Sequence, residues 1–351
     1  MSLGRAVFVT TSFPRRPGDA AGHFVLGHAQ QMLAHGWQVE VIVGGDAPAH
    51  SSHDGLIVHW AGGGELFGWP GVAARVREAP LRAIGVLPFA HRVRQILEDR
   101  GPFDRAVAHF IVPSAWPLLS TMACPVEVVA HGGDVRLLLA LPSWVRRRII
   151  GSILSRDARL YFVSSELRRS LCASLPAPLA ARLQRQSAVR LPAVCLPDAE
   201  ARRSAAAPWL EDKGTPYAVL AGRMVESKRF ALGLRAAATT KLDTLVIGDG
   251  PERAHLERIA RQLQSNIRFL GRLNRVETLG LIERAAVLLH PSAAEAAPTV
   301  VLEARALGVP VVACKAGDLA LWATTDDGLH LVSPDPLAMA RGVRRTIPQL
   351  T

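Results

Sequence analysis

The chain has 351 residues, of which 49% are hydrophobic and 20% charged, so it can bury a sizeable core and is expected to form two domains of about 150 to 200 residues each. Aromatic residues are only 5%, yet aliphatic residues are abundant and the 29 glycines and 24 prolines are scattered, which excludes disordered, collagen-like and disulfide-stapled chains. The net charge of +11 favours anionic partners such as phosphates, nucleic acid or a lipid surface, without choosing among them.

Short β-branched apolar runs alternate with amphipathic helical patterns along the chain. This alternation predicts an α/β fold of two Rossmann-like domains that face each other across a cleft, the first covering residues 1–205 and the second residues 206–351. Strands are expected at residues 6–9, 39–43, 56–59, 126–130 and 160–163 in the first domain, and at 217–220, 244–247, 267–269, 287–289 and 309–313 in the second. Helices are expected, among others, at residues 24–35 and 81–98.

Glycine-containing turns follow several of these strands, at the sheet edge where open parallel sheets bind ligands. The turns lie at residues 10–22, 62–64, 131–134, 222–228, 248–250 and 271–274. No G-x-G-x-x-G, Walker A, G-x-S-x-G or H-E-x-x-H motif is present, which argues against an ordinary NAD enzyme and against common NTPase and hydrolase chemistry.

The spacing of Cys124, Cys172, Cys195 and Cys314 fits no zinc or redox motif, so reduced thiols in a cytosolic compartment are expected, with no metal bound to them. The chain start lacks the apolar core of a secretory signal. The longest uncharged stretch, residues 106–126, holds three prolines, which speak against a transmembrane helix. A cytoplasmic protein is expected.

The most informative string runs from Glu295 to Glu303, from a strand end through a proline turn into a helix. Two carboxylates at the two ends of such a loop can accept hydrogen bonds from sugar hydroxyls, and the backbone N–H groups of Thr299 and Val300 suit a phosphate. In isolation, this pattern is more often a turn cap and a solvated helical carboxylate.

Upstream, Arg223 and Lys228 place two cations on the turn after the strand at 217–220. An arginine fork and a lysine point charge together suit a diphosphate. Alone, the two would more often lie on a solvated turn. Together with the Glu295–Glu303 segment and the GDG turn at residues 248–250, they favour a nucleotide-diphosphate site.

In the order and spacing of these strings, the chain resembles the retaining glycosyltransferases of the GT-B fold, family 4, which transfer a sugar from a nucleotide-diphosphate donor. The resemblance covers residues 217–340 closely, and the first half more loosely, through Gly22 in the first turn and the H-G-G-D string that begins at His131. The donor-domain strings are AGRMVESKR (221–229), VIGDGPERAHLE (246–257), the run from 267 to 313, and GLHLVSPDPLAMA (328–340).

The resemblance implies a role for each matching residue. Arg223 and Lys228 would hold the diphosphate and stabilise the charge that develops on it. Glu295 would bind the hydroxyls of the transferred sugar, and Glu303 the ribose. His131 would touch the sugar or the reacting centre. The remaining donor-site residues would be Gly22 beside the phosphate, Arg272 and Leu273 beside the base, and Gly222, Pro298, Thr299 and Val300 around the diphosphate and sugar.

The implied reaction is front-face displacement with the departing phosphate as base. No D-x-D pair suggests a catalytic metal, so no obligatory cofactor or metal is expected. The donor is a nucleotide-diphosphate sugar whose base and sugar stay open, and the acceptor is the hydroxyl of a glycan, a glycolipid or an aglycone.

Two segments, residues 72–94 and 143–156, combine arginines with apolar residues at helical spacing. Such helices either cover a sheet with their arginines in water or lie on an anionic bilayer at the inner face of the membrane. Two alternative functions stay open, a GT-B nucleotide-sugar epimerase and a non-enzymatic basic protein that binds anionic lipid or nucleic acid. Nucleic acid is not an expected partner, because no recognisable module is present and stacking aromatics are few.

Overall fold

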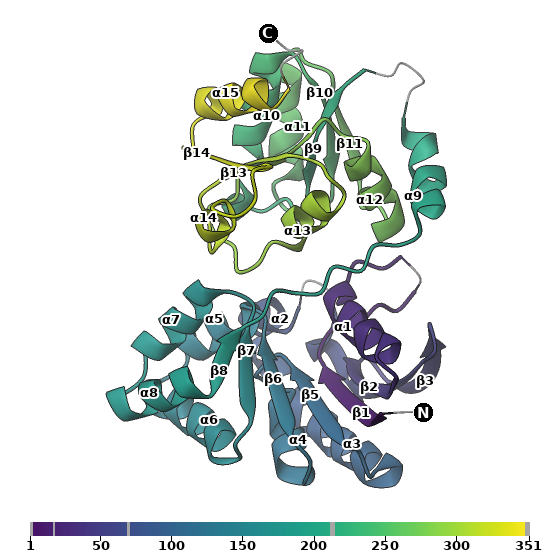
Figure 1. The fold of residues 1–351 in the computed structure, drawn as a ribbon, viewed down its shortest axis with the longest axis vertical. Coiled ribbons are helices and arrows are strands. Elements are labelled where there is room, and N and C mark those ends of the chain that lie inside the picture. The colour runs from purple at the N-terminus through teal and green to yellow at the C-terminus, as the bar shows by residue number, and fades with distance from the viewer. Residues whose placement is uncertain (1–2, 17, 69–70, 211–214, 348–351) are drawn as a thin grey trace. The chain divides into compact units, whose positions relative to one another are not determined.

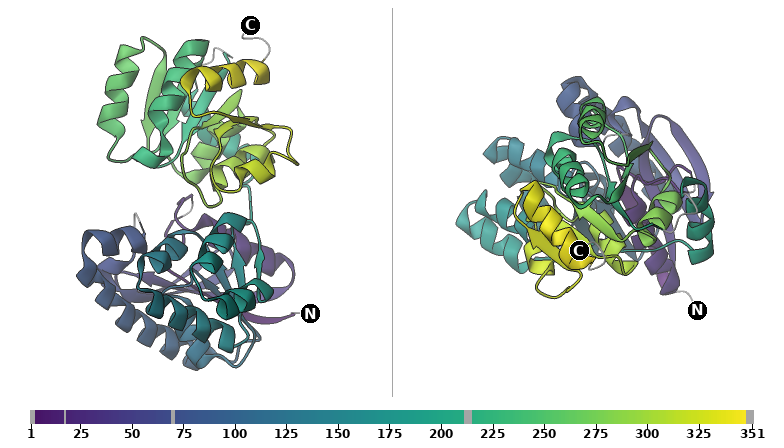
Figure 2. Two further views of the ribbon diagram at one scale, coloured as in Figure 1. Left: turned by 90° about the vertical axis from the view of Figure 1, so that its left-hand side faces the viewer. Right: turned by 90° about the horizontal axis from the view of Figure 1, so that it is seen from above.

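A computed structural model of the chain describes residues 3–16, 18–68, 71–210 and 215–347. The chain divides into two units, one of Met1–Pro17 with Ala21–Ala193 and one of Gly18–Ala20 with Val194–Thr351. Each unit holds one mainly parallel sheet flanked by helices (Figures 1 and 2). The predicted α/β class with two Rossmann-like domains is therefore confirmed.

The first unit contains an eight-stranded sheet in the order β3-β4-β2-β1-β5-β6-β7-β8. Its neighbouring strands pair in parallel, except β3 with β4, which pair antiparallel. Its strands are β1 (Gly4–Thr10), β2 (Trp37–Gly45), β3 (Pro48–His53), β4 (Leu56–Gly63), β5 (Arg105–His109), β6 (Val126–Ala130), β7 (Arg159–Phe162) and β8 (Ser187–Val189). Its helices are α1 (His23–Ala34), α2 (Val72–Glu78), α3 (Val86–Arg100), α4 (Ala115–Thr121), α5 (Gly133–Ala140), α6 (Ser143–Ser155), α7 (Ser165–Ala173) and α8 (Ala177–Arg185), with the 3-10 turns η1 (Gly64–Leu66) and η2 (Pro80–Gly85).

The five strands expected in this unit correspond to β1, β2, β4, β6 and β7, whereas β3, β5 and β8 were not expected. The β3 segment, PAHSSH, is almost wholly exposed and pairs only with β4, so it carries no apolar signal. The helix expected at residues 81–98 divides into η2 and α3. It breaks at Gly85, where a Cβ would lie 2.3 Å from the carbonyl oxygen of Gly63.

The second unit contains a six-stranded parallel sheet in the order β11-β10-β9-β12-β13-β14, the doubly wound order of dinucleotide-binding domains. Its strands are β9 (Tyr217–Ala221), β10 (Asp243–Ile247), β11 (Ile267–Gly271), β12 (Val287–His290), β13 (Val311–Cys314) and β14 (Leu329–Val332). Its helices are α9 (Ala199–Ala206), α10 (Phe230–Thr240), α11 (Arg253–Gln262), α12 (Arg275–Glu283), α13 (Thr299–Ala306), α14 (Leu319–Trp322) and α15 (Pro336–Thr346), with the turns η3 (Ala207–Trp209) and η4 (Glu226–Lys228).

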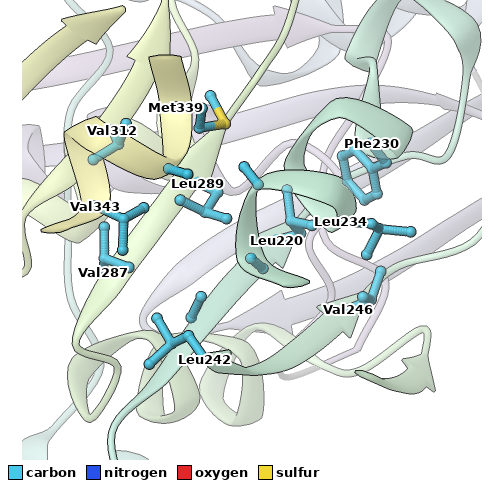
Figure 3. Close-up of a cluster of buried hydrophobic side chains, with 14 of the residues drawn as sticks. Leu220, Phe230, Leu234, Leu242, Val246, Val287, Leu289, Val312, Met339 and Val343 are labelled. Atoms are coloured by element: carbon cyan, nitrogen blue, oxygen red, sulfur yellow. The ribbon is translucent and has the colours of Figure 1, made fainter. Parts of the chain in front are cut away.

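One face of this sheet packs against α10 and α15 and forms an aliphatic core (Figure 3). Because parallel strands are covered on both faces, β9 is buried along its whole length. The core anchors the strands whose carboxyl ends carry the candidate site. Its labelled members are Leu220, Phe230, Leu234, Leu242, Val246, Val287, Leu289, Val312, Met339 and Val343.

The expected domain boundary after residue 205 falls inside α9, and the structure groups this whole helix with the second unit. Helix α9 packs against α12, and a half-buried ion pair, in which Arg202 Nη2 lies 2.6 Å from Glu283 Oε1, joins the two helices. The polar, alanine-rich sequence of α9 gave no sign of this attachment.

In both sheets the strand order reverses beside the first strand of the unit, between β1 and β5 and between β9 and β12. The carboxyl ends of strands at such a reversal point border the crevice in which open α/β sheets bind ligands. Within the described ranges, we find no helix long and apolar enough to span a bilayer.

Candidate functional site

The reversal point of the second unit is bordered by two loops, residues 222–229 after β9 and residues 291–298 after β12. Both belong to the strings that the sequence singled out. A backbone hydrogen bond of 2.8 Å, donated by the N–H of Ala293 to the carbonyl oxygen of Ser227, joins them. The two loops therefore form one structural assembly.

Lys228 and Glu295 form an ion pair between these loops. Lys228 Nζ lies 2.5 Å from Glu295 Oε1, and Nε2 of His290, at the end of β12, lies 3.1 Å from the same oxygen. Burial would raise the pKa of the Glu295 carboxyl, but the neighbouring His290 imidazole and the charge of Lys228 bring this pKa down to about 2. Burial lowers the pKa of His290. At neutral pH Glu295 is therefore ionised and His290 is neutral.

Glu303, the second carboxylate of the string, is bound by Arg275 at the start of α12. Nη2 and Nε of Arg275 lie 2.8 and 3.1 Å from Glu303 Oε1, and Nη2 also donates to the carbonyl oxygen of Cys195 at 2.8 Å. The two side chains are only 14% and 9% exposed. Because a carboxylate this buried needs a charged partner, Arg275 holds Glu303 in place.

Pro298 immediately precedes α13, which begins with Thr299 and Val300. The N–H groups of Val301 and Leu302 donate to the carbonyl oxygen of Pro298 at 3.0 and 3.3 Å, which closes the first turn. The N–H groups at the start of an α-helix have no acceptor within the helix and favour an anion. The α13 N-terminus thus lies directly after the loop that carries the ionised Glu295.

The turn that holds Arg223 is supported by the GDG turn after β10. A Cβ on Gly248 would lie 1.9 Å from the carbonyl oxygen of Gly222, and one on Gly250 would lie 2.3 Å from that of Met224. Gly248 in turn donates its N–H to the carbonyl oxygen of Gly271 at 2.7 Å. The turns after β9, β10 and β11 are therefore stacked backbone to backbone, and these glycines are required by close approach.

Arg223 is exposed on this stack, and Arg272 and Leu273 follow β11 directly. The side chain of Leu273 is half-buried against a second apolar core of this unit, which includes Val219 of β9 and Val301 of α13, whereas Arg272 is exposed. The predicted donor residues of the second unit therefore lie in the loops that follow β9, β11 and β12, at one edge of the sheet, and in helix α13, which continues from the last of these loops.

Gly22 and His131 belong to the first unit. Gly22 precedes α1 with a φ of 66°, and a Cβ on it would lie 2.3 Å from the carbonyl oxygen of Ser12. Only glycine therefore fits between the turn after β1 and the first residues of α1. Its expected role beside a phosphate stays a prediction.

His131 follows β6 and is held by Asp134. Oδ1 of Asp134 accepts the N–H groups of His131 and Gly132, both at 3.0 Å, and Oδ2 accepts that of Ile111 at 2.7 Å. Helix α5 begins at Gly133, so Asp134 lies in its first turn and joins the loops after β5 and β6.

Two further histidines continue from His131. Nε2 of His131 lies 2.9 Å from Nδ1 of His109, and Nε2 of His109 lies 3.1 Å from Nδ1 of His28. Sequence reasoning missed both of these partners, as it missed Arg275 and His290. The available signal was position, since His109 and His290 each end a strand at a reversal point.

No group of three or more His, Cys, Asp or Glu side chains is arranged to hold a metal ion in the parts of the chain that the structure describes. The structure, over the residues that it describes, joins none of the four cysteines in a disulfide, and Cys172 and Cys314 are buried.

Residues 215–348, nearly the whole second unit, match the family model described as glycosyl transferases group 1. Among curated proteins, the chain is 33% identical over 79 residues to the phosphatidylinositol N-acetylglucosaminyltransferase gpi3 subunit of Schizosaccharomyces pombe. It is 30% identical over 106 residues to a GDP-mannose-dependent monoacylated alpha-(1-6)-phosphatidylinositol monomannoside mannosyltransferase of Corynebacterium glutamicum. These matches cover 22% and 28% of this chain, and only 17% and 28% of the two relatives.

Solved structures are similar over nearly the whole chain. The sucrose-phosphate synthase of Thermosynechococcus elongatus superposes with a TM-score of 0.71 at 19% identity, covering 99% of this chain and 90% of that one. An Escherichia coli structure titled trehalose-6-phosphate, bound with UDP-2-fluoro glucose, gives 0.70 at 14% identity, covering 97% and 91%. The chain thus has the two Rossmann-like domains of the GT-B fold, and most of its second unit matches the glycosyl transferases group 1 model.

Proposed function

We propose that this protein is a retaining glycosyltransferase that moves a sugar from a nucleotide-diphosphate donor to an acceptor hydroxyl. The observation that carries the proposal is the contact between Lys228 and Glu295, because it places a cation and an ionised carboxylate together at the reversal point of a glycosyl transferases group 1 domain. A nucleotide-diphosphate sugar presents a diphosphate next to a polyol. The Lys228 cation suits the diphosphate, and the Glu295 carboxylate suits the hydroxyls of the polyol.

In the proposed complex, Arg223 and Lys228 bind the diphosphate, and the N–H groups at the start of α13 add to them. Glu295 accepts hydrogen bonds from hydroxyls of the transferred sugar, for which its ionised state is suited. Glu303 binds the ribose from the position at which Arg275 holds it. Arg272 and Leu273 border the base through their backbone.

The proposed reaction breaks the bond between the anomeric carbon and the diphosphate, and the acceptor oxygen attacks from the face that the diphosphate leaves. The acceptor proton passes to the departing phosphate, so that configuration is retained without a covalent intermediate on the protein. Lys228 and Arg223 stabilise the growing negative charge of the diphosphate. We propose that these two cations supply the charge neutralisation, so that magnesium adds little to the rate.

The donor proposal is tested by binding of UDP, GDP, ADP and their sugar conjugates, measured by calorimetry and thermal shift, first without and then with magnesium. We expect one nucleotide to raise the melting temperature, and Glu303→Ala to weaken its affinity at least about tenfold, or about 1.4 kcal/mol. Glu200→Ala, an exposed residue of α9, is the matched control and should bind like the wild type. Equal binding by both variants would contradict the assignment of Glu303.

The reaction class is tested with the nucleotide sugar that binds. A product whose new linkage keeps the anomeric configuration of the donor supports retaining transfer. Inversion would contradict the retaining mechanism, and release of a free 2-epimer would favour the epimerase alternative over transfer.

We further propose a lipid-linked acceptor at the cytoplasmic face of an anionic membrane. The names of both curated relatives specify phosphatidylinositol derivatives. In the first unit, η2 and the start of α3 expose Leu81, Ile84 and Leu87 to 79%, 63% and 62%, and α6 exposes Trp144 to 67% beside the exposed Arg147 and Arg148. Exposed apolar side chains among cations suit an anionic bilayer surface.

Sedimentation with vesicles of phosphatidylcholine and phosphatidylserine tests this surface. Binding should weaken with salt and with Leu81→Ser plus Ile84→Ser, whereas phosphatidylcholine alone should bind little. Binding that is absent from anionic vesicles would remove the membrane from the proposal and leave a soluble glycan or aglycone as acceptor.

A further inference from the structure

The three histidines of the first unit come from separate parts of the chain and form one continuous row. His109 ends β5 and His131 follows β6, and these strands pair in parallel with His109 opposite Val129, which brings both rings to the same sheet edge. His28 reaches His109 from α1. The two nitrogen–nitrogen distances, 3.1 and 2.9 Å, are those of hydrogen bonds.

Aromatic side chains enclose the row. The ring centroid of Phe8 lies 4.9 Å from that of His28 and 5.3 Å from that of His109. The ring centroids of Phe24 and Phe110 lie 4.5 and 4.8 Å from that of His131. His109 is 2% exposed. Such an apolar surrounding opposes the charged form of an imidazole.

All three rings are neutral at physiological pH. Burial lowers the pKa of His131 to about 3 and that of His28 to about 4, and it lowers the pKa of His109 well below its usual range. The charges that act on His28 come from neighbouring elements, namely Arg190 after β8, Arg105 on β5 and Glu127 on β6. Both arginines pair with Glu127. Arg190 also lowers the pKa of His109.

A neutral imidazole has one N–H and one lone pair, so the direction of one hydrogen bond in the row sets the direction of the next. Only two arrangements are consistent. Either every ring carries its proton on Nδ1, so that His28 donates to His109 and His109 to His131, or every ring carries it on Nε2 and the direction reverses. The first arrangement leaves an N–H on Nδ1 of His131 at one end of the row, and the second leaves an N–H on Nε2 of His28 at the other end.

We propose that His28 and His109 are positioning residues that fix His131 as a neutral donor whose Nδ1–H is presented to an oxygen of the bound sugar or phosphate. The row itself does not depend on the proposed function, whereas the use of His131 as a donor to substrate rests on it. His131 would therefore act as a hydrogen-bond donor, and the acceptor proton would not be removed by this ring.

The test is nitrogen-15 NMR of the full-length protein labelled at histidine and free of substrate, with each ring assigned from the loss of its signals in a single variant. We expect His28, His109 and His131 to be neutral and protonated on Nδ1 down to pH 5. Protonation of His131 on Nε2, unlike tautomers within the row, or titration of any of the three rings above pH 6 would overturn the proposal.

A pair of variants at His28 separates positioning from packing. His28→Phe keeps an aromatic ring beside Phe8 but removes both nitrogens, so His131 should become a mixture of tautomers. His28→Asn places an amide near the former Nδ1 and should restore the single tautomer. The exposed His91 on α3 supplies the control, and His91→Phe should leave His131 unchanged.

Kinetics give the functional readout, with the nucleotide sugar that the wild type uses. His28→Phe should lower kcat about tenfold with little change in the donor KM, and His28→Asn should recover most of this loss. Equal kcat in the wild type and His28→Phe would overturn the positioning role. A single Nδ1 tautomer in a protein that transfers no sugar would leave the row intact and refute the proposed function instead.

Discussion

The ion pair of Glu295 predicts a pH-dependent stability of the second unit. Glu295→Gln keeps the shape of the side chain and its ability to accept hydrogen bonds, but it removes the charge that faces Lys228. Because the carboxylate is 11% exposed, solvent screens this charge only weakly, and its loss should destabilise the fold around β12.

The magnitude follows from the pKa difference. The pKa of the Glu295 carboxyl is about 2 in the folded state against an ordinary 4.5, which corresponds to a stabilisation of about 3 kcal/mol at pH 7. Since the folded pKa is the lower one, the stabilisation is complete above the unfolded value and is lost as the pH falls towards 2. At pH 3 less than half of this stabilisation should remain.

The assay is amide hydrogen exchange of β12 and β13, read by mass spectrometry on wild type and Glu295→Gln at pH 7 and at the lowest pH at which both stay folded. The difference between the two proteins in the free energy of opening of β12 and β13 should become smaller as the pH falls. Glu200→Gln, whose carboxylate is 88% exposed, is the control and should shift stability by less than about 0.5 kcal/mol at either pH. A free-energy difference between wild type and Glu295→Gln that does not change with pH would refute the proposed stabilisation by the ionised carboxylate.

Three further predictions concern the same unit. Arg275→Met leaves the carboxylate of Glu303 without its charged partner and should cost about 3 to 5 kcal/mol in urea unfolding, so a cost below about 1 kcal/mol would show that the pair is not needed. Lys228→Ala should raise the Kd of the nucleoside diphosphate that binds the wild type at least about tenfold in calorimetry, and an unchanged Kd would remove this residue from the diphosphate site. Gly248→Ala places a Cβ 1.9 Å from a carbonyl oxygen of the neighbouring turn, and Gly308→Ala meets nothing within 4 Å, although both glycines have positive φ. Urea unfolding should therefore show a cost about twice as large at Gly248 as at Gly308, and equal costs would mean that the stacked turns can give way.

Most of the strands that the sequence predicted are largely buried, because a buried strand shows a continuous apolar run, although the sequence reasoning missed the buried strand β5. The run at residues 126–130 matches β6 residue for residue. In contrast, β3 is an exposed edge strand whose residues pair with β4 through the backbone. The β8 segment is three residues long and largely exposed, so its side chains carry no pattern. Such strands are specified by the neighbour that they pair with, which a single sequence does not reveal.

The candidate site likewise contains residues that the sequence indicates and supporting partners that it does not. Lys228 and Glu295 lie in the connections after β9 and β12, Glu303 lies in α13, and the residue types of these segments indicate their chemistry. The structure brings Lys228 and Glu295 into contact although they are 67 residues apart. Their supporting partners carry no local signal. In the sequence, Arg275 is an ordinary basic residue at the start of a helix. It binds Glu303 because α12 and α13 pack together.

The two units show why these partners recur at strand ends. In a parallel sheet every carboxyl end lies at one edge, so a polar residue that ends a strand meets the loop after the neighbouring strand. His290 at the end of β12 meets Glu295 in this way, and His109 at the end of β5 meets His131. In each unit, a buried histidine of lowered pKa thus holds a residue for which the sequence predicted a catalytic role. A histidine that ends a buried strand beside a reversal point is therefore a useful sequence signal for the residues that orient a site, even where its own chemistry is not used.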